Sequence, residues 1–257
     1  MNLRHIAARL YVAARPVVPV LLLLSAMSAP IHAATIYNAS ADFSYAANPN
    51  GVWSYNVGLI PLPFVQSGWG GVPGEMFWAT TLAGTVPPAW GKAATTPAGT
   101  TDWLPGDVIV HASNSGSGGA DQGNITWTSP GAGYIDISGK AWDAVHSPGR
   151  DDAWSLSLDG DVLASRPGIV GVQRGDAAAD FANNLLPLKS LANLTVQAGD
   201  VLKFEVQKAA GCCGHFSGLE LTVSLVPEPP AALAASLMLT SLLSSILWRR
   251  RSSSHGS

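Results

Sequence analysis

The amino-acid sequence predicts an all-β fold, an antiparallel β-sandwich, for the central part of the chain. Short apolar runs recur there between clusters of Gly, Pro, Asn, Asp and Ser. Apolar and polar residues alternate within these runs, which is the two-residue period of a half-buried strand. No stretch keeps the 3.6-residue period of an amphipathic helix. The segment 34–230 is long enough for one such domain.

Five runs in chain order predict the strands. They are ITWTSP from 125, GYIDISGKAW from 133, AWSLSLDGDVLAS from 153, LANLTVQAGDVLKFEVQ from 191 and GLELTVSLV from 218. In the third run Trp154, Leu156 and Leu158 alternate with serines, so one face of the strand is apolar. Asp159 and Gly160 then supply the positive backbone dihedrals of a two-residue turn. This run is therefore expected to form a β-hairpin.

The fourth run contains a second turn. Residues 198–200 read AGD, and alternation before and after them is carried by Leu194, Val196, Leu202, Phe204 and Val206. We expect a strand on each side of this turn, with the second strand returning along the first. Antiparallel strands at this spacing are typical of sandwiches.

The N-terminus has the charge order of an export signal. Basic residues at Arg4, His5, Arg9 and Arg15 precede an apolar block and then small residues up to Ala33. This order predicts a secretory signal peptide over 1–33, cleaved after Ala33. Its apolar block, 17–24, is too short to span a bilayer permanently.

The C-terminus contains one uncharged segment, Ala231–Trp248, of 18 residues. As a helix it would be about 27 Å long, close to the roughly 30 Å of a hydrocarbon core. Pro229 and Pro230 separate it from the body. Three arginines follow it directly, namely Arg249, Arg250 and Arg251. We expect a single transmembrane helix whose arginines stay on the cytoplasmic side, so that the body faces outward.

These C-terminal features resemble a known sorting signal. Val226, Pro227, Glu228 and Pro229, followed by one marginal span and a basic cluster, are similar to the PEP-CTERM signal of Gram-negative bacteria. The resemblance covers 225–251, with a polar tail over 252–257. It implies that the chain is a substrate of exosortase, an integral membrane processing enzyme. It also implies an inner-membrane anchor before processing, removal of the tail, and delivery of the body to the cell surface or extracellular matrix.

The charge of the body excludes one class of partner. All 17 acidic residues lie within 34–230 but only eight of the 14 basic ones, which leaves a net charge of −9 against −3 for the whole chain. A surface of this sign repels nucleic acid and anionic lipid. We expect no nucleic-acid partner.

A second resemblance concerns the predicted ectodomain, 34–224. DFSYAANPNGVWSY at 42–55, ITWTSPGAGYIDISGKAWD from 125 and LTVQAGDVLKFEVQ from 194 are similar to ectodomains that occur with PEP-CTERM signals. Their shape is that of jelly-roll carbohydrate-binding modules, so the resemblance implies a jelly-roll-like sandwich. It concerns strands and turns and supports a fold more than an activity.

Tryptophans are the first candidate ligand contacts, because indole faces stack on sugar rings. Trp69, Trp90 and Trp103 lie in Gly/Pro-rich connections, where side chains reach solvent or a ligand more often. If the body binds exopolysaccharide, we expect these three to contact it. Three others suit the sandwich core, namely Trp53, Trp127 and Trp154.

The run GCCGH at 211–215 holds the only two cysteines, Cys212 and Cys213. In an oxidising envelope they form either a vicinal disulfide, with Gly211 and Gly214 supplying slack, or two free or intermolecularly paired thiols. A zinc site with His215 is disfavoured, because structural zinc needs a wider thiol spacing and a fourth ligand. No metal site is predicted here.

The other polar residues give no catalytic motif. The sequence lacks the usual nucleophile-elbow, phosphate-loop, zinc-helix and dinucleotide motifs. His111, His146 and His215 have no local partner that would make a triad. No cofactor is predicted; a structural calcium at the acids around the hairpin is an alternative to solvated turn carboxylates, and these acids are Asp151, Asp152, Asp159 and Asp161.

We therefore expect a non-catalytic, exported surface or matrix protein with an adhesion, biofilm or exopolysaccharide-binding role. The alternative is a secreted hydrolase that acts on polysaccharide through paired acids. A third hypothesis is a structural coat protein without a small ligand.

Overall fold

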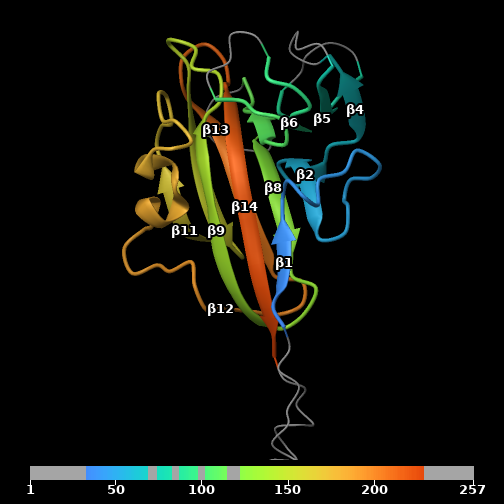
Figure 1. The fold of residues 1–257 in the computed structure, drawn as a ribbon, viewed down its shortest axis with the longest axis vertical. Coiled ribbons are helices and arrows are strands. Elements are labelled where there is room, and N and C mark those ends of the chain that lie inside the picture. The colour runs from blue at the N-terminus through green and yellow to red at the C-terminus, as the bar shows by residue number, and fades with distance from the viewer. Residues whose placement is uncertain (1–32, 69–73, 83–86, 98–101, 115–121, 229–257) are drawn as a thin grey trace, which may run out of the picture. The chain divides into compact units, whose positions relative to one another are not determined.

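The computed structural model describes residues 33–68, 74–82, 87–97, 102–114 and 122–228, and the compact unit within them is Ala34–Pro227. This unit is built from two antiparallel β-sheets that face one another (Figure 1). The prediction of an all-β sandwich is confirmed. Its only helical turns, within the described ranges, are the short 3-10 helices η2 (Ala177–Ala179) and η3 (Phe181–Asn184).

The larger sheet has eight strands. In spatial order, seven of them are β12 (Leu194–Val196), β9 (Gly133–Asp143), β14 (Phe216–Pro227), β7 (Val108–His111), β6 (Ala89–Lys92), β5 (Met76–Ala79) and β4 (Phe64–Ser67). The eighth, β1 (Thr35–Asn38), pairs with β14 beside β7. The longest strand, β14, therefore pairs with β9 along one side and with β7 and then β1 along the other.

The smaller sheet has six strands. Their order is β11 (Asp161–Arg166), β10 (Asp151–Leu158), β13 (Val201–Ala210), β8 (Gly123–Thr128), β2 (Trp53–Val57) and β3 (Ile60–Pro61). The predicted hairpin is confirmed, because β10 and β11 pair and the turn residues Asp159 and Gly160 have φ of 49° and 82°.

The turn at 198–200 differs from the prediction in one respect. Strands lie on both sides of it, but β12 pairs with β9 in the larger sheet and β13 pairs with β10 and β8 in the smaller one. The chain therefore crosses from one sheet to the other instead of forming a hairpin. Leu202, Phe204 and Val206 still alternate inward and are fully buried.

Aromatic rings fill the space between the sheets. Tyr37 of β1 lies 5.6 Å from Trp127 of β8, and Tyr55 of β2 lies 6.3 Å from Trp90 of β6, measured between ring centroids. Such pairs add about 0.5–1.5 kcal/mol to the stabilisation from burial. The rings therefore join both sheets into one core.

Two glycines allow the larger sheet to pack closely. A Cβ at Gly218 of β14 would lie 2.1 Å from the indole of Trp142, its partner on β9. Gly139 has φ of 154°, and a Cβ there would lie 2.1 Å from the Glu220 carbonyl oxygen. Neither position can carry a side chain without moving the neighbouring strand.

The sandwich has two ends, which we name from its termini. At the proximal end β1 begins and β14 finishes, and Thr35 pairs with Leu225 (Figure 1). At the distal end β9 and β13 finish, β10 and β14 begin, and the connections 144–150 and 211–215 cross between the sheets. The proximal end carries the chain termini of the domain, and the distal end carries loops.

Candidate functional site

A cluster of polar residues closes the interior at the distal end. We call Asp143, Asp152, His215 and Ser217 the distal polar cluster; each is exposed by 2% or less. Burial of this many polar groups is costly unless each has a partner. The cluster therefore makes this end of the described sandwich polar where the rest of the interior is mainly apolar.

Asp143 is the centre of this cluster. Its Oδ1 accepts a 2.7 Å hydrogen bond from His215 Nε2 and another of 2.7 Å from the His146 amide, and its Oδ2 accepts from the Gly171 amide at 2.8 Å. His146 Nδ1 lies 3.1 Å from the same Oδ2. Burial raises the pKa of Asp143, but these hydrogen bonds and the His215 charge outweigh it and hold the pKa well below its usual range. One ionised carboxylate thus joins three separate connections of the chain.

Asp152 has the opposite electrostatic character. Its carboxylate lies 2.8 Å from Ser217 Oγ and accepts a 3.1 Å hydrogen bond from the His215 amide. Burial raises its pKa to about 8, in spite of these two hydrogen bonds. Near neutral pH Asp152 is therefore mostly protonated, while Asp143 is charged.

His111 lies beside the distal polar cluster. It is 8% exposed, its Nδ1 lies 2.7 Å from the Ala112 carbonyl oxygen, and its ring meets Phe216 edge to face. The pKa of His111 is lowered to about 4, mainly by burial; the Ala112 carbonyl opposes this shift, and the charges of His215 and Arg150 add to it. The imidazole is therefore neutral near pH 7.

The structure brings His111, His146 and His215 to the same end, but it does not form a catalytic triad. The Ser217 hydroxyl contacts Asp152, and the Nε2 of His215 contacts Asp143. The hydrogen bond from nucleophile to base that defines a triad is thus absent between Ser217 and His215. The cluster positions loops; it does not present an activated serine.

A small cavity opens beside Asp143. Its volume is about 150 Å³, and it is lined by Asp143, His146, Gly171, Val172 and Gln173. His146 has a positive φ of 44° and a half-exposed side chain, so its ring borders both the cavity and solvent. The Asp143 carboxylate is already used by protein donors, which leaves His146 as the titratable side chain that faces this cavity.

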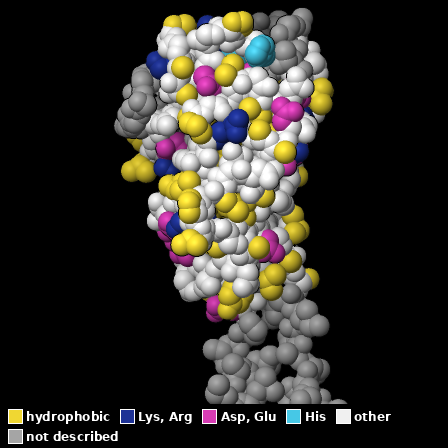
Figure 2. Space-filling model, turned by 90° about the vertical axis from the view of Figure 1, so that its left-hand side faces the viewer, with side chains coloured by type: hydrophobic (Ala, Val, Ile, Leu, Met, Phe, Trp, Pro, Cys, Tyr) yellow, Lys and Arg dark blue, Asp and Glu magenta, His cyan; other side chains and the backbone are white. Residues whose placement is uncertain are grey.

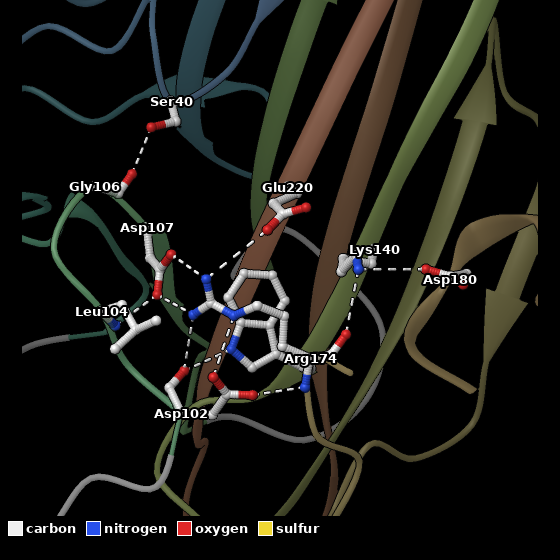
Figure 3. Close-up of polar contacts among 10 residues, drawn as sticks. Ser40, Asp102, Leu104, Gly106, Asp107, Lys140, Arg174, Asp180 and Glu220 are labelled. Carbon is white, nitrogen blue, oxygen red and sulfur yellow. Dashed lines mark hydrogen bonds and ion pairs between the residues drawn. The ribbon is translucent and has the colours of Figure 1, made fainter. Parts of the chain in front are cut away.

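The connection 167–176 is fixed at two places. At the distal end the Asp151 Oδ1 accepts hydrogen bonds of 2.8 Å from the amides of Ile169 and Val170. On the larger sheet Arg174 lies between two carboxylates, as Figure 3 shows: its Nε is 3.2 Å from Asp102 and its Nη1 is 2.8 Å from Asp107.

Arg174 also stacks on the sheet. Its guanidinium carbon lies 4.2 Å from the ring centroid of Trp142, whose Nε1 donates to the Asp102 carbonyl oxygen at 2.7 Å. We call Arg174, Asp102, Asp107 and Trp142 the arginine clamp. Planar, bidentate pairing is the geometry for which Arg is suited, so the clamp ties the connection 167–176 to the loop before β7.

Two of the predicted ligand contacts are wrong. Trp90 lies in β6 and is fully buried, and Trp103 is 1% exposed between Phe77 and Phe216. The Gly/Pro-rich surroundings of Trp90 contain a strand, and Trp103 fixes its loop to the core. Trp69 lies outside the described residues.

The three tryptophans that were predicted to lie in the core do so. Trp53, Trp127 and Trp154 are buried, as expected. All seven tryptophans of the body that the structure describes are exposed by 5% or less, namely Trp53, Trp78, Trp90, Trp103, Trp127, Trp142 and Trp154. The described surface therefore has no tryptophan platform for a sugar ring.

The cysteines lie at the distal end, in the connection between β13 and β14. Cys212 is exposed, and its Sγ lies 2.6 Å from the Sγ of Cys213. Of the side chains considered for zinc, His215 is buried with its Nε2 2.7 Å from Asp143 Oδ1, whereas Cys212 is exposed. Among the described residues, no group of three or more His, Cys, Asp or Glu side chains could hold a metal.

The four acids considered for calcium each have a protein partner. Asp151 and Asp152 are bonded as described above, Asp159 accepts from the Val201 amide at 2.8 Å, and Asp161 pairs with Lys189 at 2.7 Å.

The residues of the predicted sorting motif fall at the boundary of the described chain. Val226 and Pro227 pair with Tyr134 and Gly133 as the end of β14, so the domain continues three residues past the predicted end at 224. Leu225 is 3% exposed and continues the inward row of the strand.

Only one further residue of the predicted sorting motif lies within the described residues. Glu228 is exposed, whereas Pro229 lies outside the described residues. The arginines of the predicted membrane anchor also lie outside them, namely Arg249, Arg250 and Arg251. Their cytoplasmic position therefore stays a prediction.

No helix among the described residues is long and apolar enough to cross a membrane. The predicted signal peptide before Ala33 and the predicted span Ala231–Trp248 lie outside those residues.

Charges are mixed on one face of the described surface. On the face drawn in Figure 2, acidic and basic side chains are scattered singly among apolar ones, without a field of one sign. This arrangement gives no basic surface for nucleic acid on that face. Comparison of the chain with protein families and with curated proteins found no match.

Proposed function

We propose that the chain is an exported cell-surface or extracellular-matrix protein, sorted through its PEP-CTERM signal, with a non-catalytic β-sandwich as its ectodomain. In this proposal the signal peptide directs export, and the C-terminal helix holds the body at the inner membrane. Exosortase then removes the tail, and the body acts in adhesion or in contact with extracellular polysaccharide.

The pairing of β1 with β14 is the observation that carries the proposal. Thr35, two residues after the expected signal cleavage at Ala33, pairs with Leu225, which directly precedes the sorting motif. Both processing positions therefore leave the sandwich at its proximal end. A single tether at this end would leave the whole distal end free.

The length of β14 sets the scale of this arrangement. Its 12 residues rise by about 3.3 Å each, so the distal loops lie roughly 40 Å from the point where the tail begins. A body of this length, tethered at one end, suits a surface protein that presents its distal loops outward.

The path of the chain supports the jelly-roll-like form of the sandwich. Successive strands β8, β9 and β10 alternate between the two sheets, and so do β12, β13 and β14. Such alternation is common to jelly-roll folds. The proposed ligand class, extracellular polysaccharide, rests on this likeness of fold and not on a tryptophan platform.

The alternative of a polysaccharide hydrolase is supported less by the geometry. A glycosidase needs two carboxyl groups that flank a sugar in an open cleft. Asp143 and Asp152 are closed off from solvent, and Asp102 and Asp107 are bound to Arg174. The non-catalytic role therefore remains our proposal.

A localisation experiment tests the sorting step. We expect the double substitution Pro227→Ala and Pro229→Ala to leave the unprocessed chain in the inner membrane, because the motif that the processing enzyme reads is lost. Pro61→Ala, a proline of β3 outside the motif, is the matched control and should be processed normally. Normal release of the double variant from the membrane would contradict the proposal.

A further inference from the structure

The two cysteines form a compact feature that the proposed function does not use. They lie side by side in the connection 211–215, with Cys212 exposed, Cys213 half-buried and their sulfur atoms 2.6 Å apart. Free exposed thiols are reactive in an oxidising compartment. A pair of adjacent sulfurs therefore offers a site for exchange with other thiols and disulfides.

The backbone on both sides of the pair is held in place. Gly211 has φ of 88°, and a Cβ there would lie 2.0 Å from the Gly149 carbonyl oxygen. A Cβ at Gly214 would lie 2.1 Å from the Ala112 carbonyl oxygen, and its amide donates to Asn114 Oδ1 at 2.9 Å. These contacts fix the connection against two neighbouring loops, so the sulfurs are presented together at the surface.

The distal polar cluster also holds the connection 211–215 in place. His215, two residues after Cys213, donates its amide to Asp152 and its imidazole contacts Asp143. The connection is thus anchored on its C-terminal side in the interior of the sandwich. Cys212 is therefore exposed, whereas His215 at the end of the same connection is buried.

The two thiols share one hydrogen bond, which lowers the pKa of Cys212 and raises the pKa of Cys213. The charge of Arg150 lies near both sulfurs and acts to lower both pKa values. Lys208 is a further cation near Cys213. A thiol with a lowered pKa is the better leaving group in exchange.

We propose that Cys212 and Cys213 are a thiol–disulfide exchange site, which cycles between a vicinal disulfide and a dithiol by reaction with low-molecular-mass or protein thiols. The disulfide of adjacent residues closes an eight-membered ring, and such strained, exposed disulfides are more readily reduced than structural ones. The site would act at the distal end, away from the tethered terminus.

Reduction of the disulfide takes two steps. An external thiolate attacks Sγ of Cys213, the bond between the cysteines breaks, and Cys212 leaves as a thiolate that takes up a proton. A second external thiolate attacks the outer sulfur of the mixed disulfide, which releases Cys213 and an external disulfide. Two electrons pass to the protein, and two external thiols become one disulfide. Oxidation of the dithiol is the reverse reaction, with an external disulfide as the oxidant.

Differential alkylation of the full chain in glutathione buffers tests the cycle. We expect protein equilibrated with oxidised glutathione to resist N-ethylmaleimide and to carry two alkyl groups after reduction. Reduced glutathione should open the pair, with both states populated at an intermediate ratio. Two reactive thiols at every ratio, or a disulfide-linked dimer on a non-reducing gel, would overturn the proposal.

Single-cysteine variants test the assignment of roles. The variant Cys213→Ser leaves Cys212 as the single thiol, and its rate of reaction with iodoacetamide at pH 7 reports its thiolate fraction. In the Cys213→Ser background, Arg150→Gln should slow the reaction of Cys212 about twofold or more. Lys189→Gln removes the same charge far along the chain, at the β11 ion pair, and should leave the rate unchanged.

An unchanged rate for Cys212 with Arg150→Gln would overturn the assignment of Cys212 as the thiol whose pKa Arg150 lowers. The exchange site does not rest on the sorting signal. Failure of tail processing would leave the alkylation results unchanged, so the two proposals fail separately.

Discussion

The two ends of this sandwich are built from the same strands in opposite ways. Along β14 and β9 the inward rows finish at the proximal end in apolar residues, Leu225 and Ile135, which are exposed by 3% or less. At the distal end the same rows finish in Ser217 and Asp143, which are equally buried but polar. The proximal end is thus held by strand pairing and apolar contacts, and the distal end by carboxylates that gather loops.

This difference separates two tasks within one domain. Ordered strands at the proximal end bring the two proposed processing positions together through backbone pairing and apolar contacts. At the distal end three connections without regular structure must be fixed, and buried carboxylates can accept several backbone amides at once. Each of the following substitutions or truncations removes contacts from one part of the domain, so that its contribution to stability can be measured.

Truncation at the proximal end should have the largest effect. A chain that ends after Leu221 loses Val223 and Leu225 and the pairing partner of β1, and we expect it to lose about 5 kcal/mol or more of stability and to unfold. A chain that ends after Pro227 should unfold at the same urea concentration as the body of the full chain. Equal stability of the two truncations would show that the end of β14 does not hold this end together.

Removal of the central distal carboxylate should have the next largest effect. Asp143→Ala leaves the buried His215 imidazole and the Gly171 amide without their acceptor, so the free energy of unfolding should fall by about 3–5 kcal/mol. Asp161→Ala removes an exposed carboxylate of the β11 ion pair and should cost about 1 kcal/mol or less. Similar urea midpoints for the two variants would contradict the role given to Asp143.

The arginine clamp should contribute less. Arg174→Gln leaves Asp107, which is 8% exposed, without its cation, and we expect a loss of about 2–3 kcal/mol. Lys189→Gln is the control, since Lys189 pairs with the exposed carboxylate of Asp161 and its loss should cost about 1 kcal/mol or less. A loss for Arg174→Gln no greater than the control would show that the clamp does not stabilise the loop.

Asp152 should give the smallest effect, and one that depends on pH. The pKa of Asp152 is near the usual 3.8 in the unfolded chain and about 8 in the folded chain. Between these two pH values the folded state binds a proton that the unfolded state has lost, so the contribution of Asp152 to the stability of the fold decreases as the pH rises. Asp152→Asn keeps the shape but does not ionise. Relative to the natural chain, the variant should gain about 1–3 kcal/mol between pH 5 and pH 8.

The exposed Asp136, whose carboxylate accepts from the Asn193 amide, supplies the control for this titration. Urea unfolding of Asp136→Asn at the same two pH values should show a difference within about 0.5 kcal/mol of the natural chain. If the difference in stability between Asp152→Asn and the natural chain were the same at pH 5 and at pH 8, Asp152 would be ionised in the folded protein.

The sequence predicts the strands well because alternation is a local property. The hairpin through Asp159 and Gly160 and the inward rows of β13 and β14 follow directly from it. The choice of sheet does not: β12 and β13 are joined by a tight turn, yet each pairs with strands far away in the chain. The alternation of apolar and polar residues within a strand does not indicate which distant strand it pairs with.

The distal polar cluster was missed although alternation contains its signal. Counting by twos from Ile135 and Ile137 of β9 arrives at Asp143, and from Trp154 of β10 it arrives at Asp152. An acid on the inward row at the end of a strand is thus a sign of a buried carboxylate. Trp90 and Trp103 failed for a different reason, because Gly/Pro-rich surroundings indicated exposed loops where β6 and a core contact lie.

The central claim, a body released from a tether at its proximal end, is tested most directly by the mass of the mature protein. β14 pairs as far as Pro227, so cleavage should fall within 227–230, after the last paired residue. We expect intact-mass spectrometry of envelope and secreted fractions to give a chain that begins near Ala34 and ends between Pro227 and Pro230. Copies that all retain Arg249–Ser257 would contradict the account.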